Sequence, residues 1–355
     1  MLAFLKYYPR FSFLVYRKLV RICALLIILP LCANAQSVST IPVGAVTVTA
    51  SAAPSVSSPR YTSLSLPLLN IPSYTGFLSA VTANTITVAQ AVSGTINALD
   101  PCFIRINSGL NQGLTLLINS NSGSVLSLDT SRTGSLTTLP IALSVGSSGD
   151  TYSIYPADTL YSLFGNTAQG GTSPATADQV WLWQPALSAY AKYYYNTTNT
   201  RWQDTDFNDP ANNTVILPDA GMMYLRRATS PISFMITGVV PACDASTQIR
   251  NSGYTLLASG FPISMLLSNL GLSGNANWVK SSAFSTADQV WIWQPLLGSY
   301  SKYFYNSGTS QWEDSDFGAP SGSTVINPQT PIMIKRFVTG QISYSSYVSS
   351  KPYVL

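Results

Sequence analysis

After residue 35, the chain alternates between short runs of β-branched, aromatic and other apolar residues and clusters of Gly, Asn, Pro and Ser. Short runs of this kind, separated by turn-forming residues, are typical of strands joined by turns. No stretch after residue 35 carries an apolar stripe at i, i+3, i+4 and i+7 over the length of a helix. We therefore predict an all-β protein: an N-terminal antiparallel β module followed by two homologous β-meander units, each led by a short helix.

The β module is predicted from alternating segments in the first half of the chain. Residues 76–81 and 85–88 alternate across an Ala-Asn pair, which indicates a hairpin. Further strands are expected at 102–106, 114–118 and 125–128. We assign residues 75–155 to this module and residues 36–74 to an N-terminal strand and a linker.

An internal repeat dominates the second half of the chain. The run Thr-Ala-Asp-Gln-Val-Trp-Leu-Trp-Gln-Pro at 176–185 returns at 286–295 with one Leu-to-Ile change. The offset of 110 residues holds without a gap from 176 to 226, and about half of these positions are identical. Such a match indicates a duplicated unit, and in each copy the strand and turn pattern predicts a three-strand meander.

The match continues upstream with an offset that differs by four residues. Residues 156–165 and 262–271 each predict one short helix, with Asp158 or Ser264 as N-cap and Gly165 or Gly271 as C-terminal stop. We therefore expect repeat unit 1 at 156–233, a connector at 234–261 and repeat unit 2 at 262–355.

Several of these motifs together resemble a known family. They are the Gly-Asp-Thr-Tyr-Ser-Ile-Tyr-Pro run at 149–156, the segment 159–165, the doubled Ala-Asp-Gln-Val-x-x-Trp motif and the segment from Arg105 to Asn119. In this combination the chain resembles an uncharacterised paralogous family of exported proteins known mainly from verrucomicrobial genomes. The resemblance implies export and paralogy. It brings no assigned activity and hence no catalytic residues.

The first 35 residues are typical of a signal peptide. A basic segment without acidic residues precedes an apolar run at 22–32, and Ala-Asn-Ala at 33–35 fits the small-x-small cleavage rule. We predict a mature chain that begins at Gln36, has no transmembrane segment and lies in the periplasm, at the outer surface or outside the cell. The alternatives are an uncleaved membrane anchor and, less well supported because Leu31 precedes it, a lipoprotein modified at Cys32.

The charge balance excludes several functions. Charged residues make up 9% of the chain, against about 25% in typical proteins. The chain has 18 basic and 14 acidic residues, and removal of the leader takes five basic residues and leaves 13 against 14. A nucleic-acid partner is therefore not expected. The chain has no His, which excludes Ser-His-Asp and Cys-His catalysis.

Two cysteines, Cys102 and Cys243, remain after removal of the leader. In an exported chain they can form one disulfide. The alternative is two buried free thiols, and the sequence leaves both open.

Aromatic residues recur in both copies and are the first candidates for a site. Trp181 and Trp183 share one face of a strand, while Val180 and Leu182 share the other. Such a strand either lies between two packed layers or displays an aromatic stripe, which would suit stacking on sugar rings. Core packing is the competing interpretation, and the lysines at 192 and 302 are expected to lie over the neighbouring tyrosines as cation–π partners. The candidate ligand-binding residues are Trp181, Trp183, Tyr190, Tyr193, Trp202, Trp291, Trp293, Tyr300, Tyr303 and Trp312.

Acidic residues also recur in both copies. Asp204 and Asp206 match Asp314 and Asp316, and spaced Asp residues in a loop can ligate Ca²⁺. The competing interpretation is turn chemistry, in which Asp side chains accept backbone N–H groups. The same pairs are the only candidates for a glycan-active hydrolase, since the chain has a single Glu at 313.

The sequence thus favours a non-catalytic structural or binding protein of the cell surface, envelope or matrix, without a required cofactor. Polysaccharides or other envelope proteins are the expected partners. The alternatives are a carbohydrate-binding module that uses the Trp and Tyr stripes and a hydrolase that uses the Asp pairs. An outer-membrane barrel fits poorly, because it needs alternating strands of about ten residues.

Overall fold

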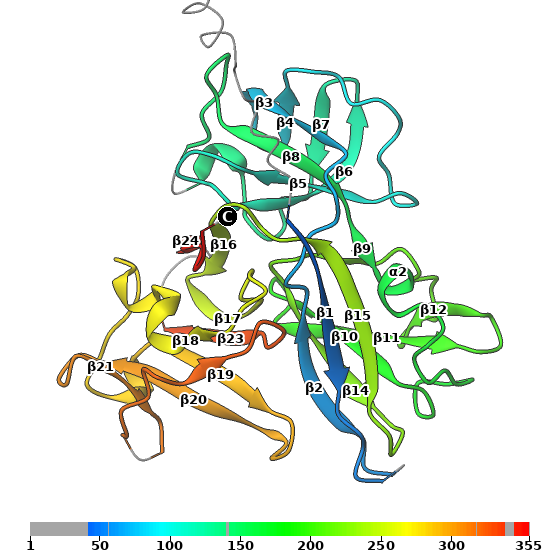
Figure 1. Ribbon diagram of the computed structural model, residues 1–355, viewed down its shortest axis with the longest axis vertical. Coiled ribbons are helices and arrows are strands. Elements are labelled where there is room, and N and C mark those ends of the chain that lie inside the picture. Colours follow the sequence, from blue (N-terminus) through cyan, green and yellow to red (C-terminus); the bar gives the residue numbers. More distant parts are fainter. Residues whose placement is uncertain (1–41, 56, 140–141, 317, 338–343, 355) are drawn as a thin grey trace, which may run out of the picture. The chain divides into compact units, whose positions relative to one another are not determined.

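The computed structural model describes residues 42–55, 57–139, 142–316, 318–337 and 344–354. The predicted signal peptide at 1–35 lies outside these residues. Strands dominate the described chain, and the only α-helix within it is α2 (Leu160–Phe164), so the all-β prediction is confirmed (Figure 1).

The predicted β module is a closed six-stranded barrel. The hairpin expected across Ala83 and Asn84 is present, with Val81 opposite Ile86. Bulges in the β3–β4 and β6–β7 pairs shift the register, which helps a short sheet to curve into closure. In order around the barrel, the strands are β3 (Tyr74–Val81), β4 (Thr85–Val88), β7 (Val125–Leu128), β6 (Thr115–Ser122), β5 (Cys102–Ile106) and β8 (Thr151–Pro156).

Each repeat copy builds a five-stranded antiparallel sheet with the same strand order. The three-strand meander forms one side, and two further strands extend it. In the first copy the order is β12 (Arg201–Asp204), β11 (Ala189–Asn196), β10 (Gln179–Gln184), β14 (Gly221–Arg226) and β2 (Arg60–Ser65). In the second it is β21 (Gln311–Asp314), β20 (Ser299–Asn306), β19 (Gln289–Gln294), β23 (Ile332–Phe337) and β17 (Ser252–Leu257).

Two smaller sheets also occur in both copies. The longer pairs are β1 (Val43–Ala50) with β15 (Ile232–Val239), and β16 (Ala245–Arg250) with β24 (Tyr344–Ser349). The shorter pairs are β9 (Asp158–Thr159) with β13 (Val215–Ile216), and β18 (Met265–Leu266) with β22 (Val325–Ile326). All three sheets of the first copy therefore have a counterpart in the second.

These pairings place the barrel inside the first copy. In the second copy, residues 258–264 join β17 to β18, whereas the equivalent strands β2 and β9 are separated by residues 66–157, which contain the barrel. The segment 36–74, expected to hold one strand and a linker, supplies β1 and β2. The expected connector at 234–261 contains the end of β15 together with β16 and β17.

The short helices differ between the copies. In the first copy, Thr159 and not Asp158 is the N-cap of α2, and it forms a capping box with Ser162. In the second copy the helix is a 3-10 turn, Leu267–Leu270, whose N-cap position is held by Leu266 without a side-chain hydrogen bond. Gly165 and Gly271 end the two turns as predicted, both with positive φ.

Each copy has its own apolar core. In the first copy, Val180 and Tyr224 of the large sheet pack with Phe234 of β15 and Phe164 of α2. The second copy repeats this arrangement around Val290. The barrel has a separate core that includes Leu78, Ile104 and Ile154.

Candidate binding site

The aromatic strands β10 and β19 lie between two packed layers. Their inner residues, Val180 and Val290, are fully buried in the cores of their own copies. Their opposite faces meet the other copy: the Trp183 indole donates to the Tyr254 carbonyl at 3.1 Å, and the Trp293 indole donates to the Tyr61 carbonyl at 2.8 Å. The contact is reciprocal, as in an isologous dimer interface.

Two tyrosines lie where the copies meet. Tyr190 and Tyr300 are equivalent in the repeat, and their hydroxyls interact with one another. Burial raises the pKa of both groups. Each ring also packs edge-on against the tryptophan of its own copy, with centroids 4.9 Å apart for both Trp183–Tyr190 and Trp293–Tyr300. Both hydroxyls therefore stay protonated, and each tyrosine ring packs on the tryptophan of its own copy.

The outer tryptophans, Trp181 and Trp291, carry lysines over their rings. The ammonium of Lys192 lies 4.6 Å from the Trp181 ring centroid, and that of Lys302 lies 4.7 Å from the Trp291 ring centroid. Cation–π contacts therefore form in both copies, but on the tryptophans and not, as we expected, on the neighbouring tyrosines, because each lysine lies directly opposite its tryptophan in the strand pairing. Tyr193 and Tyr303, which we also proposed as ligand residues, are half-buried beside the cores of their copies.

Trp202 and Trp312 require a correction. Their exposed fractions are 0% and 3%, so these side chains cannot meet a ligand in this structure. Trp202 packs against Phe164 with centroids 5.8 Å apart, and its indole donates to the Gly165 carbonyl at 2.9 Å. Trp312 packs against Trp278 with ring centroids 6.0 Å apart, so both Trp202 and Trp312 belong to the cores of their copies.

A groove of about 370 Å³ lies between the barrel and the first copy. Its apolar lining includes Leu117 of the barrel together with Leu182 and Trp183 of β10. Amide side chains of both parts, from Asn97, Asn119, Gln184 and Asn213, add polar groups. The volume lies within the range of about 300–1,000 Å³ that is usual for small-molecule sites.

The charged residues that line the groove already interact with other groups of the protein. Arg132 forms a two-pronged ion pair with Asp219, with both N–O distances at 3.0 Å. The Asp129 carboxylate accepts the backbone N–H of Ser131 at 2.8 Å. The arginine is therefore already neutralised, and the groove has no unpaired cation among the described residues that line it.

The paired Asp residues form turns. The Asp204 carboxylate accepts the backbone N–H groups of Asp206, Phe207 and Asp209 at 2.9, 2.5 and 2.6 Å. Burial acts to raise the pKa of Asp204, but these hydrogen bonds outweigh it and hold the pKa below its usual value.

The second copy repeats this turn. Asp314 accepts the N–H groups of Asp316 and Ala319 at 3.0 and 3.1 Å. Within the described ranges, no group of three His, Cys, Asp or Glu side chains is placed to hold a metal ion. The geometry therefore gives these residues a role in the turns.

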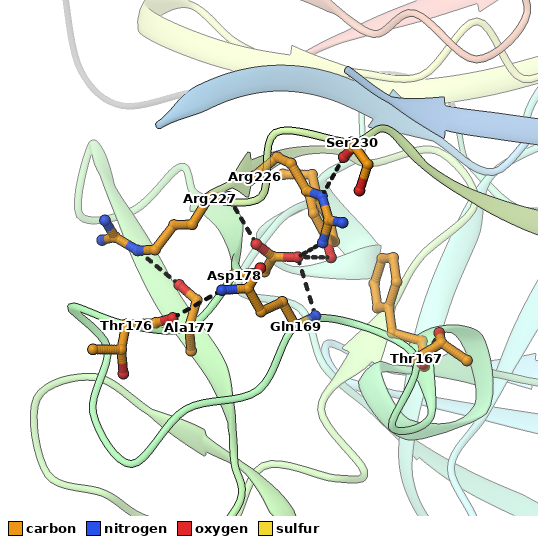
Figure 2. Close-up of polar contacts among 10 residues, drawn as sticks. Thr167, Gln169, Thr176, Ala177, Asp178, Arg226, Arg227 and Ser230 are labelled. Carbon is orange, nitrogen blue, oxygen red and sulfur yellow. Dashed lines mark hydrogen bonds and ion pairs between the residues drawn. The ribbon is translucent and has the colours of Figure 1, made fainter. Parts of the chain in front are cut away.

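A buried ion pair is the site feature that the sequence analysis missed. Asp178 has no exposed surface and bonds to the guanidinium of Arg226 at 2.5 Å (Figure 2). Asp288 pairs with Arg336 at 2.6 Å in the second copy. Burial raises the pKa of Asp288, and Arg336 opposes this shift.

The signal for this pair was present in the repeat. Both arginines lie at the same offset of 110 residues as their aspartates, although the surrounding residues of the strand have changed. Each aspartate also holds a loop: Gln169 donates its backbone N–H to Asp178 at 3.1 Å, and Val279 donates to Asp288 at 2.8 Å.

The predicted alternative of a disulfide is not formed, because Cys102 and Cys243 are free thiols. Cys102 faces the barrel core, where burial raises the pKa of its thiol to about 11. Cys243 is close enough to interact electrostatically with Tyr155, which stacks on Phe103 outside that core. Since Phe103 follows Cys102 on β5, the two thiols lie on opposite faces of the strand.

No family model matches this chain, and no curated protein shows significant similarity to it. Export and membership of the exported family therefore stay predictions from the sequence. In the part of the chain that the structure describes, no helix combines the length and apolarity needed to cross a bilayer.

Proposed function

We propose that this chain is an exported, non-catalytic protein of the cell surface, envelope or matrix that acts through binding or assembly. The export half of the proposal rests on the signal-peptide pattern of residues 1–35. The non-catalytic half rests on the repeated acidic residues.

The observation that carries the non-catalytic half is the state of Asp204. Glycoside hydrolysis needs two carboxyl groups, one of which must be protonated to act as a general acid. Three backbone N–H groups bind the Asp204 carboxylate and lower its pKa, which favours the ionised form over the protonated form that a general acid needs; the same bonds engage its oxygens in the turn, which disfavours a role as nucleophile or base. Asp314 is tied into the same kind of turn.

The binding half is supported by the groove. It combines a half-exposed tryptophan with the uncommitted side-chain amides of Asn119, Gln184 and Asn213, and the Trp183–Tyr254 hydrogen bond ties this wall to the second copy. This combination suits recognition of a small polar ligand with an apolar face.

Product analysis tests the non-catalytic proposal. The purified protein is incubated with the β-1,4-linked hexasaccharides of glucose and of xylose and with maltohexaose, and chain length is followed by mass spectrometry. We expect all three to stay intact. Shortened products that form with the unmodified protein and disappear in Asp204→Asn would overturn the proposal.

A separate measurement tests export. N-terminal sequencing of the protein from the periplasmic and extracellular fractions of the producing cells is expected to begin at Gln36. A chain that keeps residues 1–35 and stays with the cytoplasmic fraction would contradict this half.

A further inference from the structure

The groove between the barrel and the first copy has the chemistry of a sugar site. We propose that it binds a neutral oligosaccharide, with one pyranose ring stacked on Trp183 and its hydroxyls bonded to the amides around the groove. This inference rests on the proposed binding role and adds the location and the class of ligand.

Trp183 lines the groove, and its contacts with the protein hold its side chain in one orientation. Its indole N–H is already bonded to the Tyr254 carbonyl of the second copy at 3.1 Å, and Tyr190 packs against its ring edge-on at 4.9 Å. The side chain is half-exposed and lines the groove. A ring held by these contacts loses little conformational freedom when a ligand stacks on it, which favours binding.

Three of the four side-chain amides around the groove are available to hydroxyl groups, whereas the Asn97 oxygen accepts the backbone N–H groups of Leu99 and Asp100. Asn119 and Asn213 are exposed, and Gln184 is half-exposed. Their side chains make no hydrogen bond with any described residue of the protein. A side-chain amide offers both a donor and an acceptor, which matches the donor and acceptor character of a sugar hydroxyl.

The charges of the groove favour a neutral ligand. The guanidinium of Arg132 is matched by Asp219, so an anionic sugar would find no free cation among the described residues of the lining. The Asp129 carboxylate would repel an anion but can accept a sugar hydroxyl. Uronic-acid or phosphorylated glycans are therefore disfavoured.

The duplication supplies an internal control. Trp293 is the equivalent of Trp183, and its indole makes the equivalent bond to the first copy at 2.8 Å. The second copy has no inserted barrel between β17 and β18, so Trp293 lacks the barrel wall that closes the groove beside Trp183. If the sugar binds in the groove, loss of Trp183 must weaken its binding more than loss of Trp293 does.

Calorimetric titration of the purified protein with the three neutral hexasaccharides tests the inference, with a hexamer of galacturonic acid as the anionic comparison. We expect saturable binding of at least one neutral hexamer with a dissociation constant below about 1 mM, and none of the anionic one. Trp183→Ala should weaken binding at least about ten-fold, and Trp293→Ala should change it by less than about two-fold.

A second variant guards against misfolding. Asn119 and Asn213 are exposed and make no described contact that supports the fold, so the double change to Ala should leave the melting temperature unchanged and weaken binding at least about three-fold. Absence of binding by all three neutral hexamers, equal losses in the two Trp variants or tighter binding of the anionic hexamer would overturn the inference. Shortening of a hexamer would instead overturn the non-catalytic proposal, so the two failures are distinguishable.

Discussion

At the scale of single residues, acidic side chains in this protein hold loops to sheets. Asp178 accepts hydrogen bonds from the Gln169 loop and from the strand that carries Arg226, and it has no exposed surface. Removing a carboxylate from water costs several kcal/mol, and only a close counter-ion with further hydrogen bonds offsets that cost. Loss of the partner therefore leaves a penalty that the fold cannot relieve.

Arg226→Met tests this pair. The change leaves Asp178 buried without its counter-ion, and we expect the free energy of unfolding to fall by about 3–5 kcal/mol. Arg227→Met is the control, because Arg227 bonds to the Ala177 carbonyl and leaves the ion pair intact. Denaturant unfolding measures both variants, and equal losses would contradict the assigned role.

The Asp204 turn gives a pH dependence. Its folded-state pKa is lowered, so the ionised carboxylate stabilises the fold above its unfolded pKa of about 3.9, and this contribution is lost as the pH falls through the folded value. We expect Asp204→Asn to be less stable than the unmodified protein near neutral pH and the difference to shrink below about pH 4. Asp206→Asn, at an exposed position, is the control near neutral pH. A difference that stays constant with pH would contradict the assignment.

At the scale of elements, the barrel and the second copy meet through close backbone packing. Gly113 precedes β6 and has φ +91°, and a Cβ atom built there would lie 2.2 Å from the Asp244 carbonyl oxygen. Arg105 of β5 donates to the same carbonyl at 3.0 Å. A glycine is needed here because its φ is positive and because a side chain would collide with the Asp244 backbone.

Gly113→Ala is expected to lower the free energy of unfolding more than Gly94→Ala does. Gly94 has a similar φ of +83° but open space around its Cα, so it reports the conformational cost alone. The additional loss at Gly113 should be about 1–3 kcal/mol, the range for overpacking. Thermal and denaturant unfolding compare the two variants, and equal losses would show that the approach to Asp244 carries no cost.

At the scale of the whole described chain, the two repeat copies pack against each other as the subunits of a dimer do. The reciprocal bonds from Trp183 to Tyr254 and from Trp293 to Tyr61 define their interface. Gly221 and Pro331 are equivalent in the repeat and lie in contact at this interface, where a Cβ atom added to Gly221 would lie 2.4 Å from the Pro331 side chain. The barrel contributes no strand to either five-stranded sheet.

Excision of the barrel should therefore leave the paired copies folded. When residues 66–157 are replaced by the equivalent joining segment 258–264 of the second copy, we expect a soluble chain with a single cooperative unfolding transition and a β-type circular dichroism spectrum. Aggregation or loss of the transition would mean that the barrel supports the sheets. Insertion of a flexible linker at the exposed Gly123 turn is the control for chain disruption.

The sequence by itself determined the class of fold, the duplication and the turns. Strand alternation, the Gly165 stop and the repeated Asp turns are local features, set within a few residues by backbone geometry and hydrogen bonding. The short motif Tyr-Thr-x-Leu at 61–64 and again at 254–257 was a readable sign that β2 and β17 are equivalent, yet three identities are too few to stand out.

The tertiary structure decided what covers each face. A strand with Val180 on one face and Trp183 on the other needs a packing partner on each face, but its own residues do not identify these partners. The partners are distant in the chain: Tyr61 meets Trp293, and β1 pairs with β15 across the inserted barrel. Such contacts depend on how whole sheets pack, so the groove and the interface between the copies became visible only in three dimensions.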